Sequence, residues 1–116
     1  MIQDLDNTKN YKAHIFTIAG VKFHQYKEAL ETGGLTTNSV LTVVPEPENQ
    51  YDNTAVALYW EGYKLGYIPA KANDALKQRL VEGGVEGVNC FIMELNPEDT
   101  PWNMFKAIIE IPELKT

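Results

Sequence analysis

Residues 54–68 read TAVALYWEGYKLGYI, a run of alternating side chains interrupted once by a Glu-Gly pair. Apolar side chains recur at every second position of the first half, in Val56, Leu58 and Trp60, which is the spacing of a β-strand with one buried face. The Glu-Gly pair has the length and composition of a tight turn between two strands. The stretch therefore predicts a β-hairpin at the centre of the chain.

Similar apolar runs lie on both sides of this hairpin and end at glycine or proline. The six expected strands are residues 11–19, 39–44, 54–60, 63–68, 88–95 and 103–111. A short helix or turn is expected within 21–34, and a longer helix from Pro69 to about Glu82, because Gly-Gly pairs close both segments. The longer helix is expected to pack inward Ala72, Ala75, Leu76 and Leu80.

Taken together, these elements predict a mainly β fold with two short helices. Six short strands joined mostly as hairpins bury their edges best when the antiparallel sheet curls into a partly closed barrel. The length of 116 residues fits one domain. We expect a flexible polar tail over residues 1–10 and a single domain over 11–116.

Composition narrows the functional classes. No run of about 18 apolar residues is present, so no membrane span is predicted, and the polar N-terminus lacks a secretory signal, which favours a cytoplasmic location. Cys90 is the single cysteine, which excludes an internal disulfide. The net charge of −6 opposes broad, non-specific binding to nucleic acid but allows a local basic site.

The usual catalytic and metal-binding patterns are weak or missing. His14, His24 and Cys90 are too scattered for a zinc site, and Cys90 lies in an apolar run where a thiol is usually inert. No phosphate-binding GxxxxGK[ST] loop occurs, and no cofactor is predicted.

Three carboxylates, Glu46, Glu48 and Asp52, crowd one turn. Such a cluster can hold a hard cation for phosphodiester cleavage. The simpler interpretation is a solvated acidic turn in which Asp52 accepts hydrogen bonds from local amides.

Three segments in order carry a more specific signal: AGVKFH (19–24), LTVVPEPENQYDNTAVALY (41–59) and GYKLGYIPAKANDALKQRL (62–80). Their pattern resembles the HIRAN domain: a strand ending in glycine followed by basic and aromatic residues, an E-P-x-N-x-Y-D-x-x-A-[IV] core, and a hairpin returning to L-G-[YH]-[IL]-P before a helix. The resemblance is best over residues 15–80. It is specific because the central core and the LGYIP segment occur together.

The resemblance implies a six-stranded OB-like barrel that captures 3′-hydroxyl ends of single-stranded DNA without catalysis. HIRAN modules are often attached to helicases or nucleases that remodel DNA, and they also occur alone in bacteria and phages. The implied partners are therefore DNA ends and a helicase or nuclease acting in trans, in DNA repair. The nucleic-acid-binding positions carry over to Lys22, Phe23, His24, Asn49, Tyr51, Asp52, Tyr67 and Lys71.

The resemblance also assigns roles. Lys22 falls where a basic residue meets phosphate, Phe23 and His24 where two aromatic rings flank the DNA end, and Asp52 where a carboxylate meets the 3′-hydroxyl. Tyr67 matches the aromatic residue after the hairpin glycine. The chain departs from the family pattern at Gln50, Thr54 and Ala70, the last in the slot of a second basic residue.

Two other functions remain open at this point. A protein-interaction module that lost DNA binding is favoured by the acidic net charge and by Ala70. A metal-dependent hydrolase acting on phosphodiesters or acid anhydrides requires the carboxylates of the 45–53 turn to converge on one ion. We expect no enzyme activity in the chain itself, so that any hydrolase activity belongs to a partner or fused domain.

Overall fold

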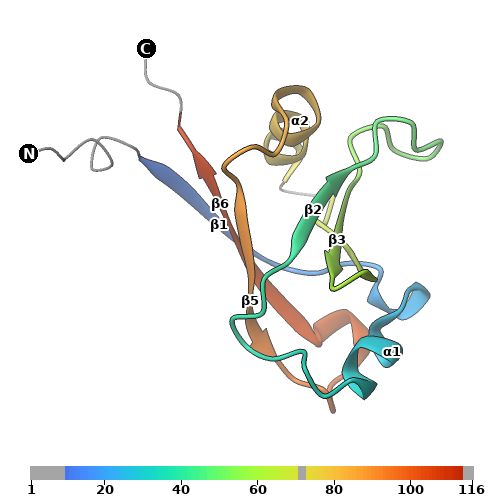
Figure 1. Ribbon diagram of the computed structural model, residues 1–116. Helices are drawn as coiled ribbons and strands as arrows, with labels where there is room; N and C mark the ends of the chain where they lie inside the picture. The colour runs from blue at the N-terminus through green and yellow to red at the C-terminus, as the bar shows by residue number, and fades with distance from the viewer. Residues whose placement is uncertain (1–9, 71–72, 114–116) are drawn as a thin grey trace, which may run out of the picture.

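The computed structural model describes residues 10–70 and 73–113 (Figure 1). The strands in these ranges are β1 (Tyr11–Thr17), β2 (Thr42–Pro45), β3 (Val56–Trp60), β4 (Tyr63–Tyr67), β5 (Asn89–Leu95) and β6 (Phe105–Pro112). The helices are the 3-10 turns η2 (Val21–Phe23) and η3 (Pro101–Asn103) and the α-helices α1 (Tyr26–Glu31) and α2 (Asp74–Gly83). The expected tail lies outside the described residues except for Asn10, whose carbonyl accepts a hydrogen bond from the Glu113 amide at 2.8 Å.

The strands form two antiparallel sheets, in the orders β1-β6-β5 and β2-β3-β4. Two isolated bridges join them: Ala19 pairs with Tyr67, and Val40 pairs with Phe91. The two sheets therefore curl toward one another into a partly closed barrel, as the sequence predicts (Figure 1). No helix in the described part of the chain is both long and apolar enough to cross a membrane.

The central hairpin is confirmed. β3 and β4 pair antiparallel, with Trp60 opposite Tyr63. Both turn residues have positive φ, 49° at Glu61 and 87° at Gly62. Two successive positive φ angles are the property of the turn type that matches the twist of a two-residue hairpin, and glycine adopts them without a steric cost.

The barrel interior is apolar. Along β6 the side chains alternate as expected, so that Phe105, Ala107, Ile109 and Ile111 are buried. Cys90 is also buried among them, and burial raises the pKa of its thiol to about 12, which suits an unreactive core residue.

The segment expected as one short helix or turn is divided in two. Gln25 anchors the chain to β4 between η2 and α1: its amide donates to the Lys64 carbonyl at 2.9 Å, and its Oε1 accepts from the Lys64 amide at 3.0 Å. The Phe23 ring on η2 is exposed to solvent, whereas Tyr26 and Leu30 of the following segment pack against the core.

The second helix begins later than predicted. After β4 the Ile68 amide still donates to the Val56 carbonyl, as in a strand. The hydrogen bond at the start of α2 runs from the Lys77 amide to the Asn73 carbonyl. The expected inward position of Ala75 was wrong, since it is exposed. Lys77 is buried there instead, together with the correctly predicted Leu76 and Leu80. The expected contact of Ala72 lies outside the described residues.

Candidate nucleic-acid interface

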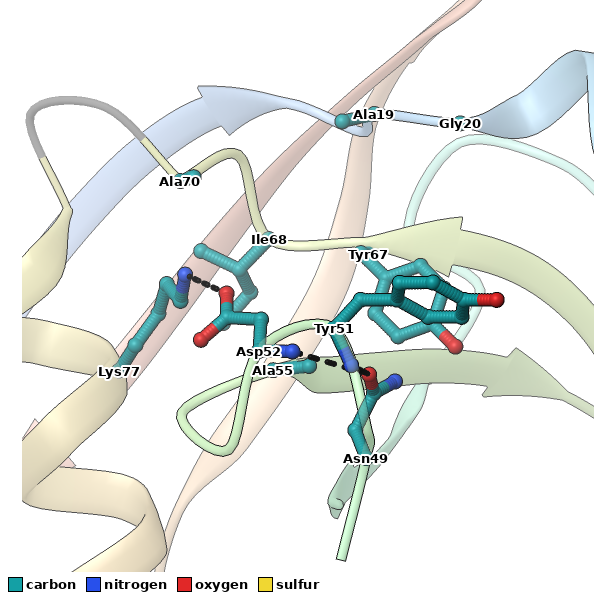
Figure 2. A pocket seen from close by; sticks show the side chains of 10 residues that line it. All are labelled: Ala19, Gly20, Asn49, Tyr51, Asp52, Ala55, Tyr67, Ile68, Ala70 and Lys77. Carbon is teal, nitrogen blue, oxygen red and sulfur yellow. Dashed lines mark hydrogen bonds and ion pairs between the residues drawn. The ribbon is translucent and has the colours of Figure 1, made fainter. Parts of the chain in front are cut away.

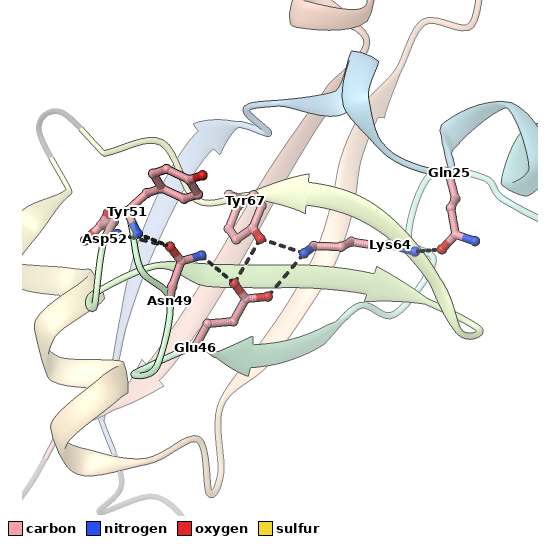
Figure 3. Close-up of polar contacts among 7 residues, drawn as sticks. All are labelled: Gln25, Glu46, Asn49, Tyr51, Asp52, Lys64 and Tyr67. Carbon is pink, nitrogen blue, oxygen red and sulfur yellow. Dashed lines mark hydrogen bonds and ion pairs between the residues drawn. The ribbon is translucent and has the colours of Figure 1, made fainter.

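The turn between β2 and β3 is organised by one side chain, Asn49 (Figure 3). Its Oδ1 accepts from the amides of Tyr51 at 2.8 Å and Asp52 at 3.1 Å, and its Nδ2 donates to Glu46 Oε1 at 2.9 Å. Short polar side chains commonly stabilise turns by such local bonds. The turn is thereby held in a conformation in which the Tyr51 side chain is 96% exposed.

Asp52 is held by two partners. Lys77 Nζ donates to Asp52 Oδ2 at 2.7 Å, and the Thr54 amide and hydroxyl donate to Oδ1 at 2.9 and 2.6 Å. The bond from Lys77, followed by those from Thr54, lowers the pKa of Asp52 to about 2. Asp52 is therefore an ionised hydrogen-bond acceptor at neutral pH, with part of its side chain open to solvent.

Tyr67 is fixed by a second polar network (Figure 3). Its hydroxyl donates to Glu46 Oε1 at 2.9 Å and accepts from Lys64 Nζ at 2.6 Å, and Lys64 Nζ lies 3.2 Å from Glu46 Oε2. Burial raises the pKa of Glu46, but its hydrogen bonds from Asn49, Tyr67 and Lys64 outweigh burial, and the net pKa is lowered. The network is thus an ion pair that clamps the phenol in one position.

His24 supports the same ring. The imidazole packs on Tyr67 with centroids 5.5 Å apart and planes tilted by 60°. Burial, and then repulsion from Lys64, lower the pKa of His24 below its ordinary 6.5. The imidazole is therefore neutral at pH 7 and acts on Tyr67 by packing rather than as a cation.

These two networks border one pocket of about 380 Å³ (Figure 2). The pocket is lined by Ala19, Gly20, Asn49, Tyr51, Asp52, Ala55, Tyr67, Ile68, Ala70 and Lys77. These residues come from the segment after β1, the connection between β2 and β3, the end of β4 with the segment that follows it, and helix α2. The bridge between Ala19 and Tyr67, with reciprocal bonds of 2.8 and 2.9 Å, holds two of these segments together.

A basic and aromatic pair stands directly beside the pocket on η2. The backbone carbonyl of Gly20, which lines the pocket, accepts from the Phe23 amide at 3.0 Å. Phe23 is 75% exposed, and Lys22 Nζ lies 5.5 Å from its ring centroid. Lys22 has no carboxylate partner in residues 10–70 and 73–113, so its charge stays available.

The structure brings together half of the residues proposed from the sequence. Asn49, Tyr51, Asp52 and Tyr67 line one pocket. Lys22 and Phe23 stand beside that pocket on η2, and His24 packs on the Tyr67 ring outside the lining. Lys71 lies outside the described residues.

Three residues that hold the pocket side chains in place were not predicted from the sequence. Lys77 is 2% exposed and bonds Asp52, and the pair of Glu46 and Lys64 positions Tyr67. A signal for Lys77 was available, because it lies on the same helical face as Leu80 and Leu76, where a lysine is unusual. No comparable signal joins Glu46 to Lys64, which lie on different elements.

The acidic turn does not gather its carboxylates around one point. Glu46 faces Lys64, and Asp52 faces Lys77. Among the residues that the structure describes, no group of three or more His, Cys, Asp or Glu side chains is placed to hold a metal ion.

Acid should weaken the fold partly through Asp52. Because the folded pKa of about 2 lies below the ordinary 3.8, the stabilisation is fully present above about pH 4 and is lost as pH falls toward about 2. We expect Asp52→Asn to flatten this part of the curve of unfolding free energy against pH, measured by urea denaturation. The control is Glu48→Gln, which removes an exposed carboxylate from the same turn. Equal pH dependence in the wild type and Asp52→Asn would contradict the role of the Lys77 bond.

Known structures show the same fold. A crystal structure of a protein from Lactobacillus plantarum matches with a TM-score of 0.68 at 20% identity, covering 91% of this chain and 99% of that chain. The crystal structure of the HIRAN domain of human HLTF matches with a TM-score of 0.60 at 13% identity, covering 93% of this chain and 80% of that chain. At these identities the likeness shows the fold alone.

Sequence comparison supplies the family. No curated protein sequence matches the chain significantly. The family model of the HIRAN domain, a DNA-binding module, matches residues 11–103, from the start of β1 through η3. That span includes every residue of the pocket and of both polar networks, so this chain belongs to the HIRAN domain family.

Proposed function

We propose that this chain captures 3′-hydroxyl ends of single-stranded DNA and performs no catalysis itself. The observation that carries the proposal is the pocket, which is lined by the ionised carboxylate of Asp52, the exposed ring of Tyr51 and the half-buried ring of Tyr67. The 3′ end of a DNA strand differs from the interior of that strand by one free hydroxyl. An ion-paired acceptor in a pocket open to solvent is suited to that difference (Figure 2).

Asp52 supplies the chemistry of recognition. A hydroxyl donates a hydrogen bond, and each oxygen of an ionised carboxylate can accept more than one. Lys77 and Thr54 therefore leave Asp52 with acceptor capacity toward the pocket. A terminal phosphate would instead bring negative charge against the carboxylate, which a partly desolvated site penalises.

The pocket also has a suitable size and lining. A volume of about 380 Å³ lies within the range of sites that enclose small organic ligands. Tyr67, clamped by Glu46 and Lys64, provides a rigid aromatic wall. Tyr51 and Phe23 provide rings on which successive bases can stack irrespective of sequence.

Few positively charged side chains are available near the pocket to contact DNA phosphates. Lys77 is neutralised by Asp52 and Lys64 by Glu46, which leaves Lys22 as the available charge beside the pocket in the described part of the chain. With a net charge of −6 over the whole chain, we expect weak binding with a shallow salt dependence, equivalent to about one or two phosphate contacts. Such a module suits an assisting role, presenting ends to a helicase or nuclease that acts in trans in DNA repair.

Alanine variants of the two exposed rings test the proposal. We expect Tyr51→Ala and Phe23→Ala each to weaken binding of a single-stranded oligonucleotide by about 1–3 kcal/mol, because a stacked base is lost. Their unfolding free energies should change by less than about 1 kcal/mol, because both rings are exposed. Fluorescence anisotropy and urea denaturation measure the two quantities.

Tyr11→Ala is the matched control, since Tyr11 is an exposed tyrosine on β1 that does not line the pocket. Its DNA affinity should equal that of the wild type. An equal loss in all three variants, or no DNA binding by the wild type, would reject the proposal and favour a protein-interaction module.

A further inference from the structure

An apolar row crosses the outer face of the β1-β6-β5 sheet. Ile15 on β1 pairs with Ile108 on β6, and Ile108 pairs with Phe91 on β5. Phe91 also pairs with Val40 in the segment before β2, so four side chains stand side by side. Their neighbours Phe16, Ile109, Ile92 and Leu41 are buried, which places the row on the opposite, outer face. Ile15 is 55% exposed and Val40 is 65% exposed.

An outer sheet face in contact with water normally carries polar side chains. The rows on each side of the apolar row follow that rule. On one side Lys106 lies between Thr17 and Glu94, and on the other Glu110 lies between Asn89 and the small side chain of Ala13. A continuous apolar row between two polar rows is a typical feature of a surface that packs against another protein surface.

The charged residues beside the apolar row indicate which protein surface packs against it. Lys106 and Glu110 lie two residues before and two residues after Ile108 on β6, so they flank the row symmetrically with opposite charges. A two-fold axis that runs along the row places a second copy of the chain face to face with the first. The strands of the second copy then run in the direction opposite to those of the first. Each Lys106 then meets Glu110 of the other copy, and each Ile108 meets its equivalent.

The alternative two-fold axis, parallel to the strands, would place Lys106 against Lys106 and Glu110 against Glu110, which is repulsive. Of these two orientations, the first brings opposite charges together, as a self-complementary isologous dimer requires. We propose that a second copy of this chain binds the row formed by Ile15, Ile108, Phe91 and Val40, with the two-fold axis along the row.

This dimer leaves the DNA pocket open, because none of the four row residues lines it. Each dimer would present two pockets, and the proposal does not depend on what those pockets bind. The ion pair of Lys106 with Glu94 of the same chain, 3.8 Å apart and exposed, is a weak competitor.

Sedimentation velocity over a dilution series tests the dimer. The sedimenting mass should rise from 13.1 kDa toward twice that value with concentration. We expect a weak dimer, with a Kd on the order of 0.1 mM. Ile15→Thr, at an exposed position, should shift the transition to higher concentration without lowering the melting temperature.

A charge exchange gives the sharper result. Lys106→Glu should weaken the dimer by about tenfold or more, because each dimer contains two copies of the affected pair. Adding Glu110→Lys to that variant should restore the dimer. Lys27→Glu, the same charge change on α1, is the control and should leave the dimer unaffected. The proposal is overturned if the wild type stays at 13.1 kDa at about 1 mM, if Lys106→Glu matches the control, or if the double variant is not restored.

Discussion

Replacing Gly66 with alanine should destabilise the fold by about 2–4 kcal/mol, from a steric clash added to an unfavourable backbone conformation. A Cβ at this position would lie 2.3 Å from the Ala19 carbonyl oxygen and 2.8 Å from Ile18 Cγ2, at a φ of +156°. The Ala19 backbone is close because it pairs with Tyr67 and joins the two sheets on one side of the barrel. The alanine variant would have to open that bridge.

Gly62→Ala is the matched control for Gly66→Ala. Gly62 also has a positive φ, 87°, but its Cβ would meet nothing within 4 Å. Its expected cost is therefore backbone strain alone, about 1–2 kcal/mol. Urea denaturation of the two variants separates the clash from the strain. If Gly66→Ala were no less stable than Gly62→Ala, the close approach of Ala19 to β4 would not be a structural constraint.

The functional consequence of Gly66→Ala follows from the same bridge. Ala19 and Tyr67 both line the pocket, so opening their pairing moves one wall relative to the other. We expect variant protein that remains folded to bind DNA ends more weakly, whereas Gly62→Ala keeps the wild-type affinity.

The hairpin could be predicted from the sequence because its information is local. The spacing of Val56, Leu58 and Trp60 indicates a strand, and the Glu-Gly pair identifies the turn. Ala57 on the opposite face is buried as well, so both faces of β3 are covered. The division of residues 21–34 into η2 and α1 could not be predicted, because Gln25 between them pairs with Lys64, 39 residues away.

The start of α2 was placed too early for a related reason. Pro69 suits a first helical turn by local rules, but the neighbouring Ile68 pairs with Val56 and keeps the chain extended. Tertiary hydrogen bonding here overrides a local preference.

The family resemblance pointed to Asn49, Tyr51, Asp52 and Tyr67 among other residues, and these four line one pocket. What the sequence could not show is how those residues are held. Asp52 and its partner Lys77 are 25 residues apart, and their contact arises only when α2 packs beside the turn. The charge state and position of the carboxylate are properties of the fold.

Discrimination between strand ends should be the second large effect. We expect the wild type to bind an oligonucleotide ending in a 3′-hydroxyl about 10- to 100-fold more tightly than the same strand ending in a 3′-phosphate. This corresponds to about 1–3 kcal/mol, the scale of a hydrogen bond to a charged group. Asp52→Asn keeps the size of the side chain and removes its charge, so it should lose most of the preference. Glu48→Gln removes a charge from the same turn and should keep it.

Capture of free 3′ ends can be tested by titrating the wild-type chain with two labelled oligonucleotides of the same sequence. One ends in a 3′-hydroxyl and the other in a 3′-phosphate. We expect measurable, weak binding of the hydroxyl end and a Kd at least about tenfold higher for the phosphate end. Equal affinity for both ends, or a preference for the phosphate, would contradict the assignment of the Asp52 pocket as a receptor for free 3′ ends.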